Sequence, residues 1–292
     1  MHLIFGYLGY GNYGDELLAS IVETHLGKTC SRLSRKNSLW QHFKLIQASK
    51  ILIGVGGLFQ DTSSLLSPWY YFLVILYARL SNKRIVLVGQ GIGPLSSPLS
   101  KLITYISFKL THQVSVRDIS SSKLLTQLKI DHYYGSDLAW SLASTAESRE
   151  PKAESTKVVI SLRQTKEPIE KIINAVKDLL LDCDSEPVFL IMQNSDISFV
   201  QKIMEEMKVS AEIINANDYE PQALIKLLQE NFSIIISMRL HALILAHIAG
   251  LELRAIVCDP KLDEVLVQIK EYDLIELSYR AEGCLETLIN KL

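Results

Sequence analysis

The chain has 292 residues, 48% of them hydrophobic, and a formal net charge of −2. This length predicts about two domains, and the apolar fraction is sufficient for two cores. A net charge near zero and the absence of Lys/Arg runs exclude a general electrostatic attraction to nucleic acid. The four cysteines show no C-x-x-C spacing, which favours reduced thiols in a cytoplasmic protein.

Apolar runs alternate with glycine-rich or polar motifs throughout the first half. Residues 3–7 predict a strand, Gly-Tyr-Gly-Asn-Tyr-Gly-Asp-Glu follows at 9–16, and residues 17–26 predict a helix. No basic region precedes the first strand, so we do not expect a signal peptide. Three further predicted strands end in Gly54-Val-Gly-Gly57, Gly89-Gln-Gly-Ile-Gly-Pro94 and Arg117-Asp118.

The longest apolar stretch, residues 68–78, is too short to span a bilayer, which needs about 20 residues. It favours a buried helix; the alternative is a surface segment that touches a membrane or a lipid-linked substrate. Residues 98–111, which include Lys101 and Lys109, leave the same two interpretations open. The second interpretation predicts peripheral contact with the inner face of the cell membrane.

Residues 144–156 predict a domain boundary because they contain no large apolar side chain. We therefore expect an N-terminal domain over 1–143, an exposed linker over 144–156 and a C-terminal domain over 157–292.

The second half continues the alternation of strand, polar loop and helix. Strands predicted over 158–162, 188–192, 232–236 and 255–257 lead into Arg163-Gln164, Gln193-Asn194, Ser237-Met-Arg-Leu-His241 and Asp259-Pro-Lys261. This pattern predicts an α/β fold of two Rossmann-like parallel-sheet domains. Ligands of such sheets bind outside the carboxyl ends of the strands, so we expect the motifs to face a central cleft.

The motif around Arg239 and His241 is the sharpest candidate for a binding site. It joins a predicted strand to a short helix that should end at Gly250. The first turn of a helix favours an anion, and a guanidinium can hold a carboxylate or phosphate through two hydrogen bonds. Histidine side chains exchange protons near neutral pH. The alternative is a structural ion pair for Arg239 and a capping role for His241.

Five motifs in order resemble the polysaccharide pyruvyl transferase family; they begin at Gly6, Gly54, Gly89, Ser115 and Ser237. The resemblance implies a GT-B-like fold of two Rossmann-like domains and transfer of pyruvate from phosphoenolpyruvate to a sugar as a cyclic ketal, without a further cofactor. It also implies an N-acetylmannosamine acceptor in a lipid-linked cell-wall polysaccharide precursor, carried on polyprenyl diphosphate. Such ketals anchor surface-layer proteins.

The resemblance also assigns residues to the two substrates. Arg239, Leu240 and His241 match the residues that contact phosphoenolpyruvate, and Lys261, Arg163 and Arg117 complete the expected donor set. On the acceptor side we place Asn12, Asp15, Glu16 and Gln90. Two features depart from the family: the segment 27–50 is short, which predicts a reduced strand and helix, and Val55 interrupts a glycine run.

Ketal formation needs both a proton donor and a proton acceptor. The negative charge of phosphoenolpyruvate suits an imidazolium, so we assign His241 as general acid and Asp15 as general base. Simpler interpretations stay open: Asp15 as a helix cap, Lys261 as a solvated turn residue, and Arg117 as the ion-pair partner of Asp118.

Two other functions stay open, a nucleotide-sugar glycosyltransferase of the same fold and a non-catalytic anion- or glycan-binding protein. The combination of Asp15, Arg239, His241 and Lys261 favours an enzyme. The remaining histidines show no metal-ligand spacing, so we expect no metal.

Overall fold

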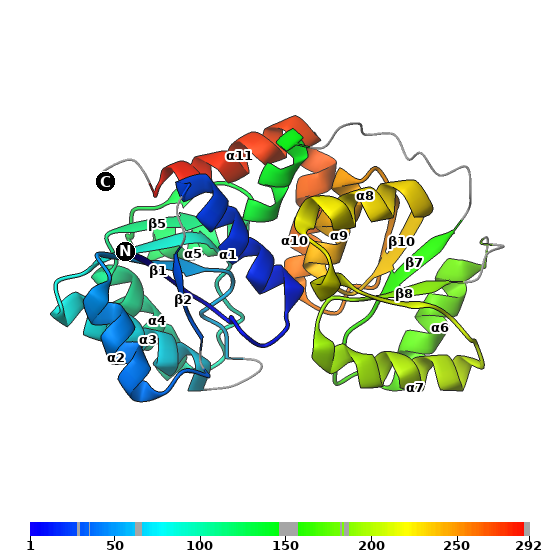
Figure 1. Cartoon of the computed structure of the whole chain (residues 1–292), viewed down its shortest axis with the longest axis horizontal. Helices are drawn as coiled ribbons and strands as arrows, with labels where there is room; N and C mark the ends of the chain where they lie inside the picture. The colour runs from blue at the N-terminus through cyan, green and yellow to red at the C-terminus, as the bar shows by residue number, and fades with distance from the viewer. Residues whose placement is uncertain are drawn as a thin grey trace. The chain divides into compact units, whose positions relative to one another are not determined.

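The computed structural model describes residues 1–27, 30–34, 36–61, 66–145, 157–181, 183 and 187–288. The chain divides into two compact units, each an α/β domain with a parallel sheet, as the sequence predicts (Figure 1). Unit 1 comprises Met1–Gly9, Asp15–Ser141 and the chain from Ile275 onward. Unit 2 comprises Tyr10–Gly14 and Leu142–Leu274.

Unit 1 contains a six-stranded parallel sheet with the order β2-β1-β3-β4-β5-β6. Its strands are β1 (His2–Phe5), β2 (Ser31–Leu33), β3 (Ile51–Val55), β4 (Arg84–Gln90), β5 (Gln113–Val116) and β6 (Tyr133–Tyr134). Its helices are α1 (Tyr13–Leu26), α2 (Leu39–Ala48), α3 (Leu66–Leu80), α4 (Pro98–Leu110), α5 (Ile119–Gln127) and α11 (Leu274–Glu286). The central strands are almost wholly apolar because helices cover both faces of the sheet.

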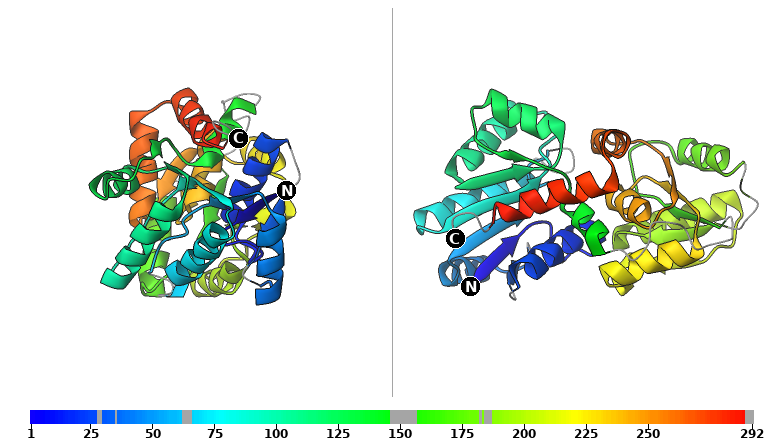
Figure 2. Two further views of the ribbon diagram at one scale, coloured as in Figure 1. Left: turned by 90° about the vertical axis from the view of Figure 1, so that its left-hand side faces the viewer. Right: turned by 90° about the horizontal axis from the view of Figure 1, so that it is seen from above.

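One core of unit 1 lies between the sheet and helices α2 to α5. Its largest side chains are those of Phe5, Phe59, Tyr71 and Phe108, and Ile46 and Leu125 extend it under α2 and α5. Figure 2 shows α2, α3 and α4 side by side, in colours from blue to blue-green.

Helix α11 packs against unit 1 although it comes last in the chain. The Ser136 hydroxyl donates to the carbonyl of Leu277 at 2.7 Å, and the Arg280 guanidinium lies 4.7 Å from the centre of the Tyr134 ring. The boundary of the C-terminal domain therefore differs from the predicted one, because these contacts connect segments far apart in the sequence.

Unit 2 contains a five-stranded parallel sheet with the order β11-β10-β7-β8-β9. Its strands are β7 (Val158–Ser161), β8 (Val188–Ile191), β9 (Ile213–Asn215), β10 (Ile234–Ser237) and β11 (Glu252–Ala255). Its helices are α6 (Ile169–Leu180), α7 (Ile197–Met207), α8 (Pro221–Asn231), α9 (Leu240–Ile248) and α10 (Pro260–Glu271), with 3₁₀ turns η2 (Asn194–Asp196) and η3 (Ala216–Asp218). The 3₁₀ turn η1 (Leu138–Thr145) begins in unit 1 and ends in unit 2. Helices α6 and α7 pack on one face, over Ile160, Phe189 and Ile236, and α8 to α10 lie on the other (Figure 1).

Several elements have other bounds in the structure than those predicted from the sequence. The last strand lies at Glu252–Ala255, earlier than the predicted 255–257, because β11 is an edge strand with charged side chains that hide its period. The short segment 27–50 holds a three-residue strand, β2, and a ten-residue helix, α2. Within the predicted linker 144–156, residues 144 and 145 belong to η1, and the rest lie outside the described residues.

Among the described residues, no helix has the length and hydropathy needed to cross a membrane.

Candidate functional site

The first glycine motif contributes a loop, Tyr10–Gly14, to unit 2. Asn12 forms an isolated antiparallel bridge with Gln193, just beyond the end of β8. The Tyr13 N–H donates to the carbonyl of Met192 at 2.8 Å. The loop is thus fixed by backbone pairing at the carboxyl edge of the unit 2 sheet.

Arg239 lies at the same edge, between β10 and α9. Its backbone N–H donates to the Ser237 hydroxyl at 2.9 Å, which shapes the turn out of the strand. Its Nη2 donates to Oε1 of Gln193 at 3.1 Å and forms an ion pair with Asp196, whose side chain is 3% exposed. The guanidinium is therefore held in one orientation by groups that follow β8.

His241 is the second residue of α9 and contacts the glycine loop. A Cβ at Gly14 would overlap the imidazole ring of His241, at Nδ1, Cε1 and Cγ. Only glycine fits this position without a shift of the ring or the loop. The predicted helix after His241 is confirmed, and Gly250 follows it with φ +84°.

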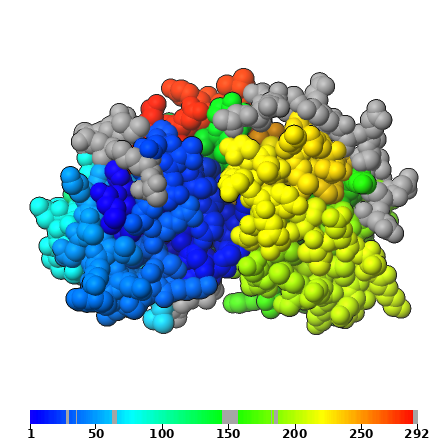
Figure 3. All heavy atoms as spheres, viewed as in Figure 1, coloured from blue at the N-terminus to red at the C-terminus, as the bar shows by residue number. Residues whose placement is uncertain are grey.

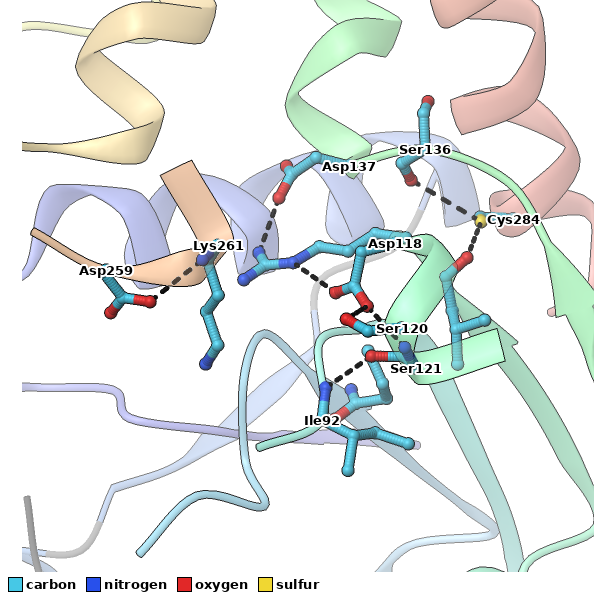
Figure 4. A network of polar contacts seen from close by, with 12 residues as sticks. Ile92, Asp118, Ser120, Ser121, Ser136, Asp137, Asp259, Lys261 and Cys284 are labelled. Carbon is cyan, nitrogen blue, oxygen red and sulfur yellow. Dashed lines mark hydrogen bonds and ion pairs between the residues drawn. The ribbon is translucent and has the colours of Figure 1, made fainter. Parts of the chain in front are cut away.

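Two more predicted cations come from loops of unit 2. Arg163 follows β7 and pairs with Asp259 at 3.7 Å, with its side chain 38% exposed. Asp259 also caps α10 by accepting from the N–H of Lys261 at 3.0 Å (Figure 4). An exposed ion pair of this length contributes little stability, so the Arg163 guanidinium can move to a ligand at low cost.

The two arginines act on a common neighbour, the thiol of Cys258. Desolvation raises the pKa of this thiol, while the positive charges of Arg163 and Arg239 act in the opposite direction. The negative charges of Asp259 and Glu167 raise this pKa as well.

The topology explains why these groups meet. The strand order of unit 2 reverses between β7 and β10, and Arg163 and Arg239 follow these two strands. Such switch points are where ligands bind in open α/β sheets. Helix α9 begins there at Leu240, so its first N–H groups add to the positive potential. The arrangement suits a compact anion that carries phosphate or carboxylate oxygens.

In unit 1 the corresponding switch point lies between β1 and β3, and it includes Asp15. Asp15 is in the first turn of α1, and its Oδ1 lies 2.8 Å from the position of a Cβ at Gly56, which has φ +82°. Glycine at 56 thus serves both the backbone conformation and the close approach of the carboxylate.

Arg117 is buried in unit 1 and pairs with two carboxylates. Its Nη1 donates to Oδ2 of Asp137 at 2.6 Å, and its Nε lies 4.0 Å from Oδ2 of Asp118 (Figure 4). Burial alone would lower the pKa of Arg117, but the charges of Asp137, Asp118 and Asp15 raise it. This geometry fits the structural interpretation of Arg117, with Asp137 as the nearer partner.

Two residues predicted for the acceptor have structural contacts. Glu16 accepts from the N–H of Gly9 at 2.5 Å and pairs with Arg32 at 2.9 Å, which closes the glycine loop. Gln90 is fully buried, and its amide donates to the carbonyl of Gly54 at 2.9 Å. Gln90 is the last residue of β4 and Gly54 belongs to β3, so this buried hydrogen bond holds the ends of the two strands together.

The polysaccharide pyruvyl transferase family model matches residues 12–260. The chain belongs to this family. Family membership makes the protein a transferase that places pyruvate on a polysaccharide. The comparison with curated proteins gives no match.

Solved structures similar to this pyruvyl transferase share its fold. UDP-GlcNAc 2-epimerase from Methanocaldococcus jannaschii is 10% identical with a TM-score of 0.59, and 99% of each chain is covered. The S. aureus MnaA–UDP co-structure is 12% identical with a TM-score of 0.58, covering 99% of this chain and 94% of that one. The Neisseria meningitidis UDP-GlcNAc 2-epimerase bound to UDP-GlcNAc is 12% identical with a TM-score of 0.57. These neighbours support a GT-B-like architecture.

Sequence reasoning missed Asp196 and the contact of Gln193 with Arg239. The only sequence signal was the polar run 193–196 after an apolar strand. Among the described residues, no group of three or more His, Cys, Asp or Glu side chains is arranged to hold a metal ion.

Proposed function

We propose that this pyruvyl transferase uses phosphoenolpyruvate as its donor and forms a cyclic ketal on an N-acetylmannosamine residue. The acceptor sugar belongs to a cell-wall precursor carried on polyprenyl diphosphate, and the product serves to anchor surface-layer proteins. The observation that supports the donor most strongly is the placement of Arg239 and Arg163 at the two strand ends that flank the switch point of unit 2.

The donor site is proposed within unit 2. Phosphoenolpyruvate carries a carboxylate and a phosphate, which together need several cations or helix N-termini. Arg239, Arg163 and Lys261 supply the cations, and Leu240 opens α9, whose N–H groups face the same edge. Asp196 orients Arg239 in advance, which lowers the entropic cost of binding.

The transfer requires two carbon–oxygen bonds to form at C2 of the donor. His241 donates a proton to the methylene carbon, and a sugar hydroxyl attacks C2. A second hydroxyl then closes the ring and phosphate leaves. Of the two hydroxyl protons, one replaces the proton given to the methylene carbon and the other leaves with phosphate.

We assign Asp15 as the base that accepts a proton from the sugar hydroxyl. Asp15 directly follows Gly14, which contacts the His241 ring. Asn12 lies in the same loop and is proposed to bind the acceptor. Glu16 and Gln90 act through the shape of the glycine motifs, in line with their contacts to Gly9 and Gly54.

Ligand-induced stabilisation tests the donor. A ligand present at 100 times its dissociation constant stabilises the folded state by about 2.7 kcal/mol. We expect a clear rise in melting temperature with millimolar phosphoenolpyruvate and little change with uridine- or guanosine-diphosphate sugars at equal ionic strength. A response to a nucleotide sugar alone would instead support a glycosyltransferase of the same fold.

A further inference from the structure

Helix α3 of unit 1 exposes a stripe of apolar side chains. Leu66, Trp69 and Leu73 recur at helical spacing on one face and are 70%, 38% and 56% exposed. The opposite face, which includes Tyr71 and Ile75, is buried against the sheet. The helix is therefore apolar on both faces, although only one of them packs on the core.

Helix α4 repeats this arrangement beside it. Leu99, Leu102 and Ile106 are 49%, 53% and 36% exposed and follow the same spacing. The two helices pack against each other. We call the six side chains of these two stripes the apolar face. A cluster of this kind on two adjacent helices is typical of an interaction surface rather than of scattered surface leucines.

Helix α2 joins the same layer. His42 Nε2 lies 2.7 Å from the Tyr70 hydroxyl, and Gln47 donates to the Tyr77 hydroxyl at 2.9 Å. Helix α2 exposes Trp40, which is 66% exposed, and Figure 3 shows the surface of this helix in blue. Each of the three helices thus has exposed Leu or Trp side chains.

The charged side chains on these three helices have one sign. Helices α2, α3 and α4 contain no Asp or Glu, whereas Lys44, Lys101 and Lys109 are exposed on them. Between residues 27 and 117 the sequence has twelve Lys and Arg and a single acidic residue, Asp61. Asp61 is 6% exposed and accepts from the N–H groups of Ser96 and Ser97, so its carboxylate is directed to the start of α4.

The charge and composition of this surface together indicate which partner it binds. Exposed Leu and Trp together with exposed lysines on the same helices are the composition of surfaces that lie in a membrane interface, where Lys and Arg attract anionic lipid. A second copy of the chain would bring two positive layers together, which like-charge repulsion disfavours.

We propose that α2, α3 and α4 form a docking surface for an anionic lipid bilayer, with the apolar face inserted at the boundary between headgroups and acyl chains. Lys44, Lys101 and Lys109 contact the lipid phosphates. None of these residues belongs to the proposed donor site. Membrane binding can therefore be tested whether or not phosphoenolpyruvate is the donor.

Vesicle flotation measures the proposed binding directly. We expect the wild-type protein to float with phosphatidylcholine vesicles that contain phosphatidylglycerol and to bind pure phosphatidylcholine vesicles much more weakly. Leu73→Glu/Leu102→Glu should lower the partition coefficient at least tenfold. The matched control is Leu181→Glu, which changes a leucine that is 84% exposed at the end of α6 and should bind like wild type. Lys44→Glu should cost about fivefold or more on anionic vesicles.

Tryptophan fluorescence gives a second readout that needs no variant. The chain has three tryptophans, of which Trp40 and Trp69 lie on α2 and α3 while Trp140 is fully buried. Brominated anionic lipids should quench the fluorescence of the wild-type protein. Absence of wild-type binding to anionic vesicles, or equal binding by Leu73→Glu/Leu102→Glu, would overturn the proposal. So would a wild-type dimer that this double variant converts to a monomer without any vesicle binding.

Discussion

Gly14 lies so close to His241 that any side chain at position 14 would overlap the imidazole ring. The two residues are more than two hundred positions apart in the sequence, and both belong to unit 2. The glycine motif therefore has a second use besides the turn it forms, because it leaves space for the ring of the proposed general acid.

The first prediction concerns this contact. Gly14→Ala should destabilise the protein by about 1–3 kcal/mol through overpacking. The same change made in a His241→Ala background should cost much less, because the ring is no longer present. Thermal or denaturant unfolding of the four proteins in this double-mutant cycle measures the coupling. Equal costs in both backgrounds would show that Gly14 serves the backbone alone.

Arg239 should serve the ligand through the geometry of its guanidinium group. Arg239→Lys keeps the charge but loses the planar fork, so donor binding should weaken about tenfold or more. The matched control is Arg254→Lys, since both arginine side chains are 15% exposed and each pairs with a carboxylate in unit 2. Calorimetric titration with phosphoenolpyruvate measures both.

Comparison with the Arg254→Lys control also shows which result would contradict a ligand-binding role of Arg239. If Arg239→Lys lowers the melting temperature strongly and binds the donor like wild type, the ion pair with Asp196 is structural only. Arg254→Lys should leave donor binding unchanged in either case.

His241→Gln separates proton transfer from binding. Glutamine retains a hydrogen-bonding group but cannot act as an imidazolium, so a general acid should lose roughly 10²- to 10⁴-fold in turnover. Steady-state rates over a range of donor concentrations give turnover and apparent affinity separately. A loss below tenfold in turnover with a weaker donor affinity would make His241 a binding residue.

Asp61 should contribute stability that depends on pH. Burial would raise the pKa of Asp61, but hydrogen bonds from the N–H groups of Ser97 and Ser96 lower it below its ordinary value. A lowered pKa in the folded state means that the contribution is fully present above the unfolded value of about 3.9 and is lost as pH falls through the folded value. The melting-temperature gap between wild type and Asp61→Asn should therefore be constant from pH 7 to pH 5 and shrink below about pH 4. A gap that persists unchanged at pH 3 would contradict this.

The sequence predicts well those features that depend on local pattern. The apolar runs before Arg163 and Arg239 are strands β7 and β10, and helix α9 ends at Ile248, two residues before Gly250. Because parallel strands direct their carboxyl ends to one edge, the pattern also predicts which loops of a unit meet.

Features that depend on contacts between distant segments could not be predicted. Nothing local indicates that Asp196 pairs with Arg239, since the two residues follow different strands. The amphipathic pattern of α11 shows that it packs on an apolar surface, but the sheet it covers is determined by contacts such as that of Ser136 with Leu277. The short edge strands β2, β6 and β9 have too few residues to show a period.

The transfer reaction itself tests the central claim most directly. The protein is incubated with phosphoenolpyruvate and a short acceptor that ends in N-acetylmannosamine, and released phosphate and product mass are measured together. We predict one phosphate for each acceptor that gains a pyruvate less one water, and loss of both signals in His241→Gln. Release of phosphate without a mass change, or transfer of a sugar from a nucleotide sugar without any reaction of phosphoenolpyruvate, would contradict the proposed function.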